Sequence, residues 1–99
     1  MSFYDSTVLL VEDSPAVTMI LTQYIKKNGF TKIVTSANGE DGIEKFDELV
    51  KMGILPVVFL DYELPDMCAL DIAPILFSKT PQVKIILETS LDEHDETIR

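Results

Sequence analysis

The sequence predicts an α/β fold in which helices cover both faces of a parallel β-sheet, a doubly wound arrangement. Two observations lead to this prediction. Short apolar runs recur along the chain, at 7–11 (TVLLV), 57–60 (VVFL) and 83–87 (VKIIL), and runs that do not alternate with polar residues suit strands buried on both faces. Helical patterns lie between these runs, and right-handed crossovers then place helices on both sides of a parallel sheet.

The first strand is expected at Thr7–Val11 and is followed by a helix. Pro15 suits the first turn of that helix, and Asn28 and Gly29 suit its end. The apolar residues of the helix have the i, i+3, i+4 spacing of a single face: Val17, Ile20, Leu21, Tyr24 and Ile25.

The second strand is expected at Lys32–Ser36, where a more polar composition indicates an edge of the sheet. A second helix is entered through Asn38 and Gly39 and closes near Gly53. One side of this helix is apolar: Ile43, Phe46, Leu49 and Val50.

The third helix is short, with Ile72, Ile75 and Leu76 on one side. Asp71 is expected as its N-cap, because Pro74 would then lie in the first turn, where N–H groups have no helical partner. The predicted order is therefore β-α-β-α-β-α-β, and the residues from 91 to 99 are expected to begin a further helix.

The composition excludes several classes of function. The 99 residues include 17 acids and 8 bases, giving a net charge of −9, which argues against nucleic acid or an anionic membrane as partner because phosphate contacts need Lys and Arg. One cysteine and one histidine exclude an internal disulfide and a Cys/His zinc site. There is no signal-peptide pattern and no apolar stretch long enough to span a bilayer. We therefore expect a small acidic domain in the cytoplasm.

Acidic and hydroxyl side chains follow three of the predicted strands. Glu12 and Asp13 follow the first, Asp61 follows the third, and Thr89 and Ser90 follow the fourth. Each of them alone is also explained as a helix cap or a turn residue. However, the carboxyl ends of parallel strands meet at one edge of a sheet, where sites form, so we expect these side chains to lie together.

Converging carboxylates repel each other, and a hard divalent cation such as Mg²⁺ removes the conflict. The ion would neutralise charge on a transferring phosphoryl group while a carboxylate acts as the nucleophile. Thr89 or Ser90 would donate a hydrogen bond to a phosphoryl oxygen.

These motifs together resemble the response-regulator receiver domain of two-component signalling. The matching stretches are VLLVED at 8–13, ANGEDG at 37–42, VFLDYELP at 58–65 and ILETS at 86–90. The resemblance runs from about residue 7 to the end of the chain. It implies a flavodoxin-like (CheY-like) sheet with strand order 2-1-3-4, and a phosphoacceptor signalling domain rather than an enzyme.

Carried over by position, the resemblance implies that Asp61 accepts a phosphoryl group from a histidine kinase or a phosphotransfer protein. Asp13 would ligate Mg²⁺ together with Asp61, and Glu12 would act through water or a longer reach. The main-chain carbonyl of Glu63 would be a further ligand. Thr89 would contact the phosphoryl group and convert phosphorylation into a surface change, a population shift between two packings.

The sequence departs from the family pattern in two places. Receiver domains continue into a fifth strand, which carries a phosphate-pairing lysine, and a fifth helix, whereas this sequence stops at Arg99. We therefore expect residues 1–99 to form one receiver domain, incomplete at its C-terminus, whose first helix is partly uncovered and available for self-association. The loop after Asp61 reads PDMCA where related loops read Pro-Gly-Met-Asp-Gly, so we expect it to take another path.

Two other functions remain open. The missing lysine favours a receiver-like interaction module that dimerises or docks to partners without being phosphorylated. A Mg²⁺-dependent phosphatase with an aspartyl nucleophile is the other alternative, but such enzymes usually have an Asp two residues after the nucleophile, where this chain has Glu63.

Overall fold

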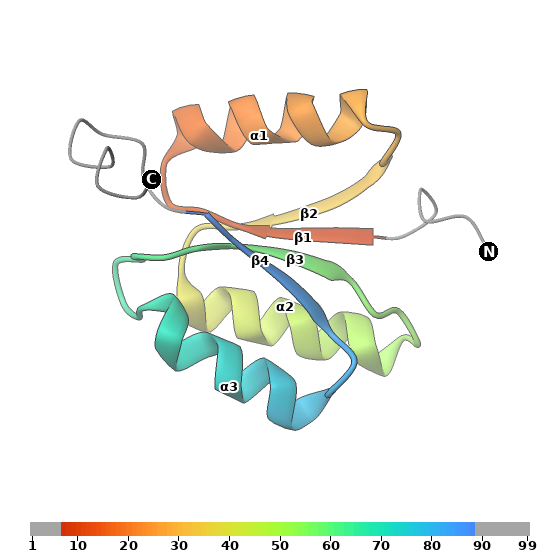
Figure 1. Ribbon diagram of the computed structural model, residues 1–99, viewed down its shortest axis with the longest axis vertical. Coiled ribbons are helices and arrows are strands. Elements are labelled where there is room, and N and C mark those ends of the chain that lie inside the picture. Colours follow the sequence, from red (N-terminus) through yellow and green to blue (C-terminus); the bar gives the residue numbers. More distant parts are fainter. Residues whose placement is uncertain (1–6, 89–99) are drawn as a thin grey trace, which may run out of the picture.

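The structure is a computed structural model that describes residues 7–88 (Figure 1). Within that range four parallel strands form one sheet in the order β2-β1-β3-β4. The strands are β1 (Thr7–Val11), β2 (Lys32–Ser36), β3 (Val57–Asp61) and β4 (Lys84–Glu88). The predicted strand order and the edge position of the second strand are confirmed. Thr89, Ser90 and the helix expected at 91–99 lie outside the described residues.

Helices cover both faces of the sheet, as the sequence predicts. In Figure 1, α1 (Pro15–Lys27) lies on one face, and α2 (Gly39–Lys51) and α3 (Ala69–Lys79) lie on the other. Successive side chains of a strand point to opposite faces, so Leu9 of β1 packs under α2 and α3 while Leu10 packs under α1. The α2–α3 face has the larger buried cluster: Leu9, Val11, Phe46, Val58, Leu60, Ala69, Ile72, Leu76 and Val83.

The first two helices begin where the sequence predicts. Ser14 caps α1, and its hydroxyl accepts a hydrogen bond from the Val17 N–H at 3.3 Å. Asn38 caps α2, and its side-chain oxygen accepts from the Asp41 N–H at 2.8 Å. Both caps satisfy N–H groups that have no partner within the helix, and both lie at the carboxyl edge of the sheet.

The predicted start of the third helix is wrong. Cys68, not Asp71, is the N-cap of α3, and its Sγ accepts from the Leu70 N–H at 3.3 Å. The reason is that the chain remains extended through Cys68, which forms an antiparallel bridge with Glu63, and turns into the helix immediately afterwards. Pro74 therefore lies inside α3 rather than in its first turn, and the Leu70 carbonyl receives no N–H from it.

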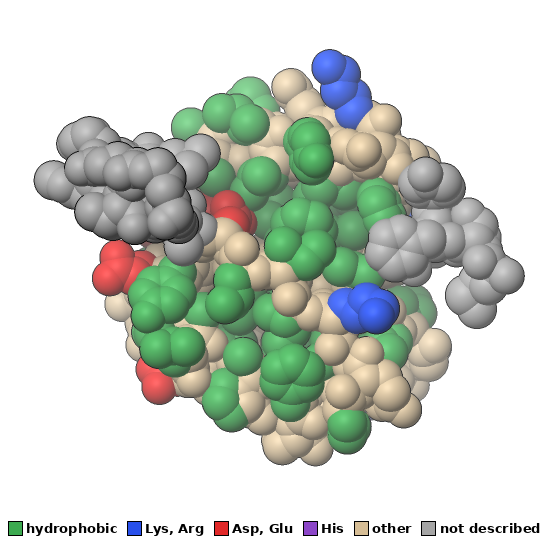
Figure 2. Space-filling view, in the orientation of Figure 1, with side chains coloured by type: hydrophobic (Ala, Val, Ile, Leu, Met, Phe, Trp, Pro, Cys, Tyr) green, Lys and Arg blue, Asp and Glu red, His purple; other side chains and the backbone are tan. Residues whose placement is uncertain are grey.

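The side of the molecule formed by α1 and β4 is more open. Ile20 and Tyr24 of α1 are 65% and 60% exposed, and Ile86 and Leu87 of β4 are 46% and 50% exposed. Figure 2 shows hydrophobic side chains spread over the middle of this side. The first helical stripe is thus partly exposed, as predicted, whereas its last residue, Ile25, is buried. None of the helices within residues 7–88 has the length and apolarity that a membrane span requires.

Candidate functional site

Three carboxylates meet at the carboxyl edge of the sheet. Glu12 and Asp13 directly follow β1, and Asp61 is the last residue of the neighbouring strand β3. One carboxylate oxygen from each of the three residues lies within 4.8 Å of the other two. The structure therefore brings together the three acidic side chains that the sequence analysis singled out as metal ligands.

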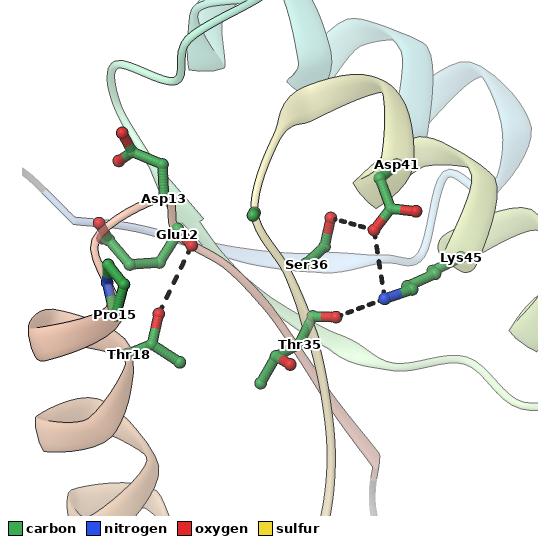
Figure 3. Close-up of a pocket in the computed structure, with 9 residues that line it drawn as sticks. Glu12, Asp13, Pro15, Thr18, Thr35, Ser36, Asp41 and Lys45 are labelled. Carbon is green, nitrogen blue, oxygen red and sulfur yellow. Dashed lines mark hydrogen bonds and ion pairs between the residues drawn. The ribbon is translucent and has the colours of Figure 1, made fainter.

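The start of α1 holds Glu12 in place. Its backbone N–H donates to the Ser36 carbonyl at 2.9 Å and so extends the pairing of β1 with β2. Its carboxylate Oε2 accepts from the Ser14 N–H at 3.0 Å, and the Thr18 hydroxyl donates to its carbonyl at 3.5 Å (Figure 3). Glu12 is buried, whereas Asp13 is exposed. The cluster thus has a fixed inner acid and an outer acid open to solvent.

Burial and mutual repulsion both act on the inner acids. Burial raises the pKa of Glu12, and the charges of Asp61 and Asp13 raise it further, against the Ser14 N–H. Burial also raises the pKa of Asp61, the charge of Asp13 adds to this, and the N–H of Glu63 opposes it. Burial and the neighbouring acids thus disfavour the ionised forms of Glu12 and Asp61, and a nearby cation would favour them.

A fourth carboxylate, which the sequence analysis did not identify, lies beside this cluster. Glu88 ends β4 and is paired in register with Asp61. Its Oε1 is buried and has no hydrogen-bond partner among the described residues. Burial, followed by the charges of Glu12 and Asp61, raises the pKa of Glu88 to about 7. The available signal was its place at the end of a strand, the same place that drew attention to Asp61.

A hollow of about 350 Å³ adjoins the acids, between the ends of β1 and β2. Lys45 is the lysine that lines it. Figure 3 shows the Lys45 side chain turned toward Thr35 and Asp41: its Nζ donates to the Thr35 carbonyl at 2.6 Å and lies 3.2 Å from Asp41 Oδ2. Lys45 is therefore committed to other partners and does not neutralise Glu12 and Asp13.

The donor set suits a hard divalent cation. Mg²⁺ prefers oxygen ligands, takes one or two carboxylates directly and keeps several waters. Glu12, Asp13 and Asp61 supply such oxygens from two strand ends, and Glu88 adds a buried carboxylate oxygen that has no hydrogen-bond partner among the described residues. These residues fit Mg²⁺.

The remaining predicted site residues are less defined. Glu63 lies in the loop after β3, with an exposed side chain, and the role of its main-chain carbonyl as a ligand stays a prediction. Thr89 lies outside the described residues, so its predicted contact with a phosphoryl group also stays a prediction.

The loop after Asp61 is fastened to the start of α2. The two carboxylate oxygens of Asp66 accept hydrogen bonds from the N–H groups of Gly39 at 2.8 Å and Glu40 at 2.9 Å. These hydrogen bonds lower the pKa of Asp66. The Leu64 N–H closes the loop on the Met67 carbonyl at 3.0 Å. An acid at position 66 therefore links the loop that follows Asp61 to the start of the helix that follows β2.

Comparison with known proteins gives a consistent result. The family model described as response regulator receiver domain matches residues 8–99. The chemotaxis protein CheY of Thermotoga maritima is 28% identical over 86 residues, which are 87% of this chain and 68% of that protein. A protein-glutamate methylesterase/protein-glutamine glutaminase of Maricaulis maris is 29% identical over 85 residues, which are 85% of this chain but only 20% of that protein.

Solved structures of response regulators are also similar to this chain. The CheX–CheY–BeF₃–Mg complex from Borrelia burgdorferi has a TM-score of 0.78 and 28% identity, over 90% of this chain and 66% of that one. The MaeR response regulator bound to beryllium trifluoride has a TM-score of 0.72 and 31% identity, over 93% of this chain and 73% of that one.

Proposed function

This chain belongs to the family of response regulator receiver domains, which are signalling modules, and we propose that it accepts a phosphoryl group on Asp61 in cytoplasmic two-component signalling. The observation that carries the proposal is the meeting of Glu12, Asp13 and Asp61, each with a carboxylate oxygen within 4.8 Å of the others. A histidine kinase or a phosphotransfer protein would be the donor, and Mg²⁺ the cation.

The proposed reaction uses the Asp61 carboxylate as nucleophile. One of its oxygens attacks phosphorus, the bond between phosphorus and the donor's histidine nitrogen breaks, and an acyl phosphate forms on Asp61 while the freed imidazole keeps the electron pair. When bound, Mg²⁺ supplies positive charge that stabilises the transferring phosphoryl group.

The residues around Asp61 have separate proposed tasks. Asp13 and Glu12 hold the cation, with Glu12 oriented by the Ser14 N–H. The Glu63 main-chain carbonyl is a further proposed ligand, and Thr89 is the proposed hydroxyl contact to the phosphoryl group. The acyl phosphate would then shift the population between two packings of the region after β4.

Phosphorylation by a small acyl-phosphate donor tests this proposal. With Mg²⁺ present, we expect the intact mass of the full chain to increase by one phosphoryl group, and we expect Asp61→Asn to abolish the increase. Asp71→Asn, at an exposed position of α3, is the matched control and should be phosphorylated like the native chain. Phosphorylation of Asp61→Asn to the native level would contradict the proposal.

A titration of the native chain with Mg²⁺, followed by NMR, tests the cation site independently of phosphate chemistry. We expect amide shifts to change around Asp13 and Asp61, and a beryllium fluoride complex to add only when Mg²⁺ is present. Unchanged shifts at both residues would contradict the metal site.

Association with a second copy of the chain is the other candidate function. The exposed side chains of Ile20, Tyr24, Ile86 and Leu87 favour it, together with β4, whose one neighbour among the described strands is β3. Open strand edges and apolar patches promote association. We expect the sedimentation coefficient to rise with concentration, and a folded monomer at high micromolar concentration would contradict this candidate.

A further inference from the structure

Glu88 is an acidic residue that the proposed function leaves without a task. Its backbone is fixed, because its carbonyl accepts from the Tyr62 N–H at 3.0 Å and its position in β4 is paired with Asp61. Its side chain is not satisfied: Oε1 is buried and has no hydrogen-bond partner within residues 7–88. A buried carboxylate without a partner is costly, so the ionised form of this side chain is disfavoured unless a positive charge lies nearby.

The lysines of the described chain do not supply that neighbour. Six of the seven lie at the amino edge of the sheet, in the last turn of a helix or at the first residue of a strand: Lys26, Lys27, Lys32, Lys51, Lys79 and Lys84. Lys84 begins the strand that Glu88 ends, and four residues of extended chain span about 13 Å. Lys45, at the carboxyl edge, is held by Thr35 and Asp41.

What does lie next to Glu88 is the proposed cation site. Glu88 is paired in register with Asp61 on the neighbouring strand, and the charges of Glu12 and Asp61 both act on its carboxylate. Glu12 in turn is held from its other side by the Ser14 N–H, which binds Oε2 at 3.0 Å. Glu88 is not one of the three residues whose oxygens are all within 4.8 Å of one another. Glu88 is therefore not counted among the three proposed ligands.

We propose that Glu88 supports the cation site electrostatically: its carboxylate, beside Asp61 at the end of β4, adds negative potential from the β4 side. This inference rests on the proposed function, since it assumes that Glu12, Asp13 and Asp61 bind a divalent cation. Residues just outside the ligand set that interact with metal ligands typically change metal affinity by roughly 10- to 100-fold when they are mutated. Glu88 thus makes the site a stronger cation binder than its three ligands alone.

Calorimetric titration of the native chain and its variants with MgCl₂, without any phosphoryl donor, tests the inference. We expect Glu88→Gln to weaken Mg²⁺ binding by about tenfold, because Gln keeps the shape of the side chain but removes its charge. Glu88→Asp retains the charge and should restore much of the affinity, which a purely structural role would not require. Glu48→Gln makes the same change at an exposed position of α2 and should bind like the native chain.

The outcomes separate this inference from the proposed function. If the native chain binds Mg²⁺, Asp13→Asn loses binding and Glu88→Gln binds with native affinity, the role of Glu88 is overturned while the cation site stands. If Glu88→Gln and Glu88→Asp are equally weakened, the charge of Glu88 is not responsible and the inference is overturned. If the native chain itself does not bind Mg²⁺, both fail together.

Discussion

Asp41 and Asp66 lie at the start of α2, whereas Glu12, Asp61 and Glu88 lie between the ends of β1, β3 and β4. Both groups of acids occupy the carboxyl edge of the same sheet, but their neighbours differ. Two backbone N–H groups bind the carboxylate of Asp66. The second group consists of acids that face one another.

The pKa values of the two groups shift in opposite directions, in keeping with their different neighbours. The Ser36 hydroxyl and the Lys45 ammonium lower the pKa of Asp41, and the N–H groups at the start of α2 lower that of Asp66, as expected where unpaired N–H groups and the helix dipole favour negative charge. In the other group, burial comes first among the causes that raise the pKa. The described chain therefore stabilises the ionised forms of Asp41 and Asp66 and disfavours those of the acids at the proposed cation site.

Glu88→Gln, studied without divalent cations, is expected to change the unfolding free energy most, and it therefore tests the contrast between the two groups of acids most directly. The folded chain raises the pKa of Glu88 from 4.5 to about 7, so between these values the folded state binds more protons than the unfolded state. The contribution of Glu88 to stability is complete below about pH 4.5 and is lost as the pH rises through about 7. At about pH 8 we expect Glu88→Gln to be more stable than the native chain by about 2 kcal/mol, allowing for solvent screening.

Urea unfolding of both proteins across this pH range measures the effect. The difference in unfolding free energy between variant and native chain should grow from about pH 4.5 to about pH 8, while contributions of acids distant from Glu88 cancel. Addition of Mg²⁺ should reduce the advantage of the variant, because we expect the native chain to bind the ion more tightly and binding to the folded state stabilises it. A difference that does not vary with pH would show that Glu88 is not destabilised by its charge.

Much of the fold could be predicted because it depends on local patterns and on one general rule. The buried runs of β1 and β3, Pro15 in the first turn of α1 and Asn38 at the entry to α2 are local signals. The meeting of Glu12, Asp13 and Asp61 follows from parallel topology, which sends every strand end to one edge. The start of α3 was mispredicted because Cys68 is a less frequent cap than Asp71, and because the bridge from Cys68 back to Glu63 is a tertiary contact.

Glu88 shows why the site itself was only partly predictable. In the sequence it is one polar residue at the end of an apolar run. Its importance depends on strand register, which pairs it with Asp61, and on burial of Oε1 without a partner. Neither property is encoded in the spacing of residues near position 88. Asp66 is similar, because its two N–H donors come from residues 39 and 40, distant in the sequence.

A smaller change in unfolding free energy, of opposite sign, is expected at Asp41, which belongs to the group of acids that have hydrogen-bond partners. Ser36 is buried and its hydroxyl donates to Asp41 Oδ2 at 2.8 Å. We expect Ser36→Ala to lower the unfolding free energy by about 1 kcal/mol, the usual net worth of such a hydrogen bond, and to raise the pKa of Asp41, since this hydroxyl is the largest cause that lowers it. Urea unfolding measures the free energy, and NMR titration of the Asp41 carboxyl measures its pKa.

Ser78→Ala removes an exposed hydroxyl, which donates to the Ile75 carbonyl, and is the control with little effect. If Ser36→Ala instead stabilised the chain, as Glu88→Gln is expected to do, the distinction between satisfied and unsatisfied acids at this edge would be wrong.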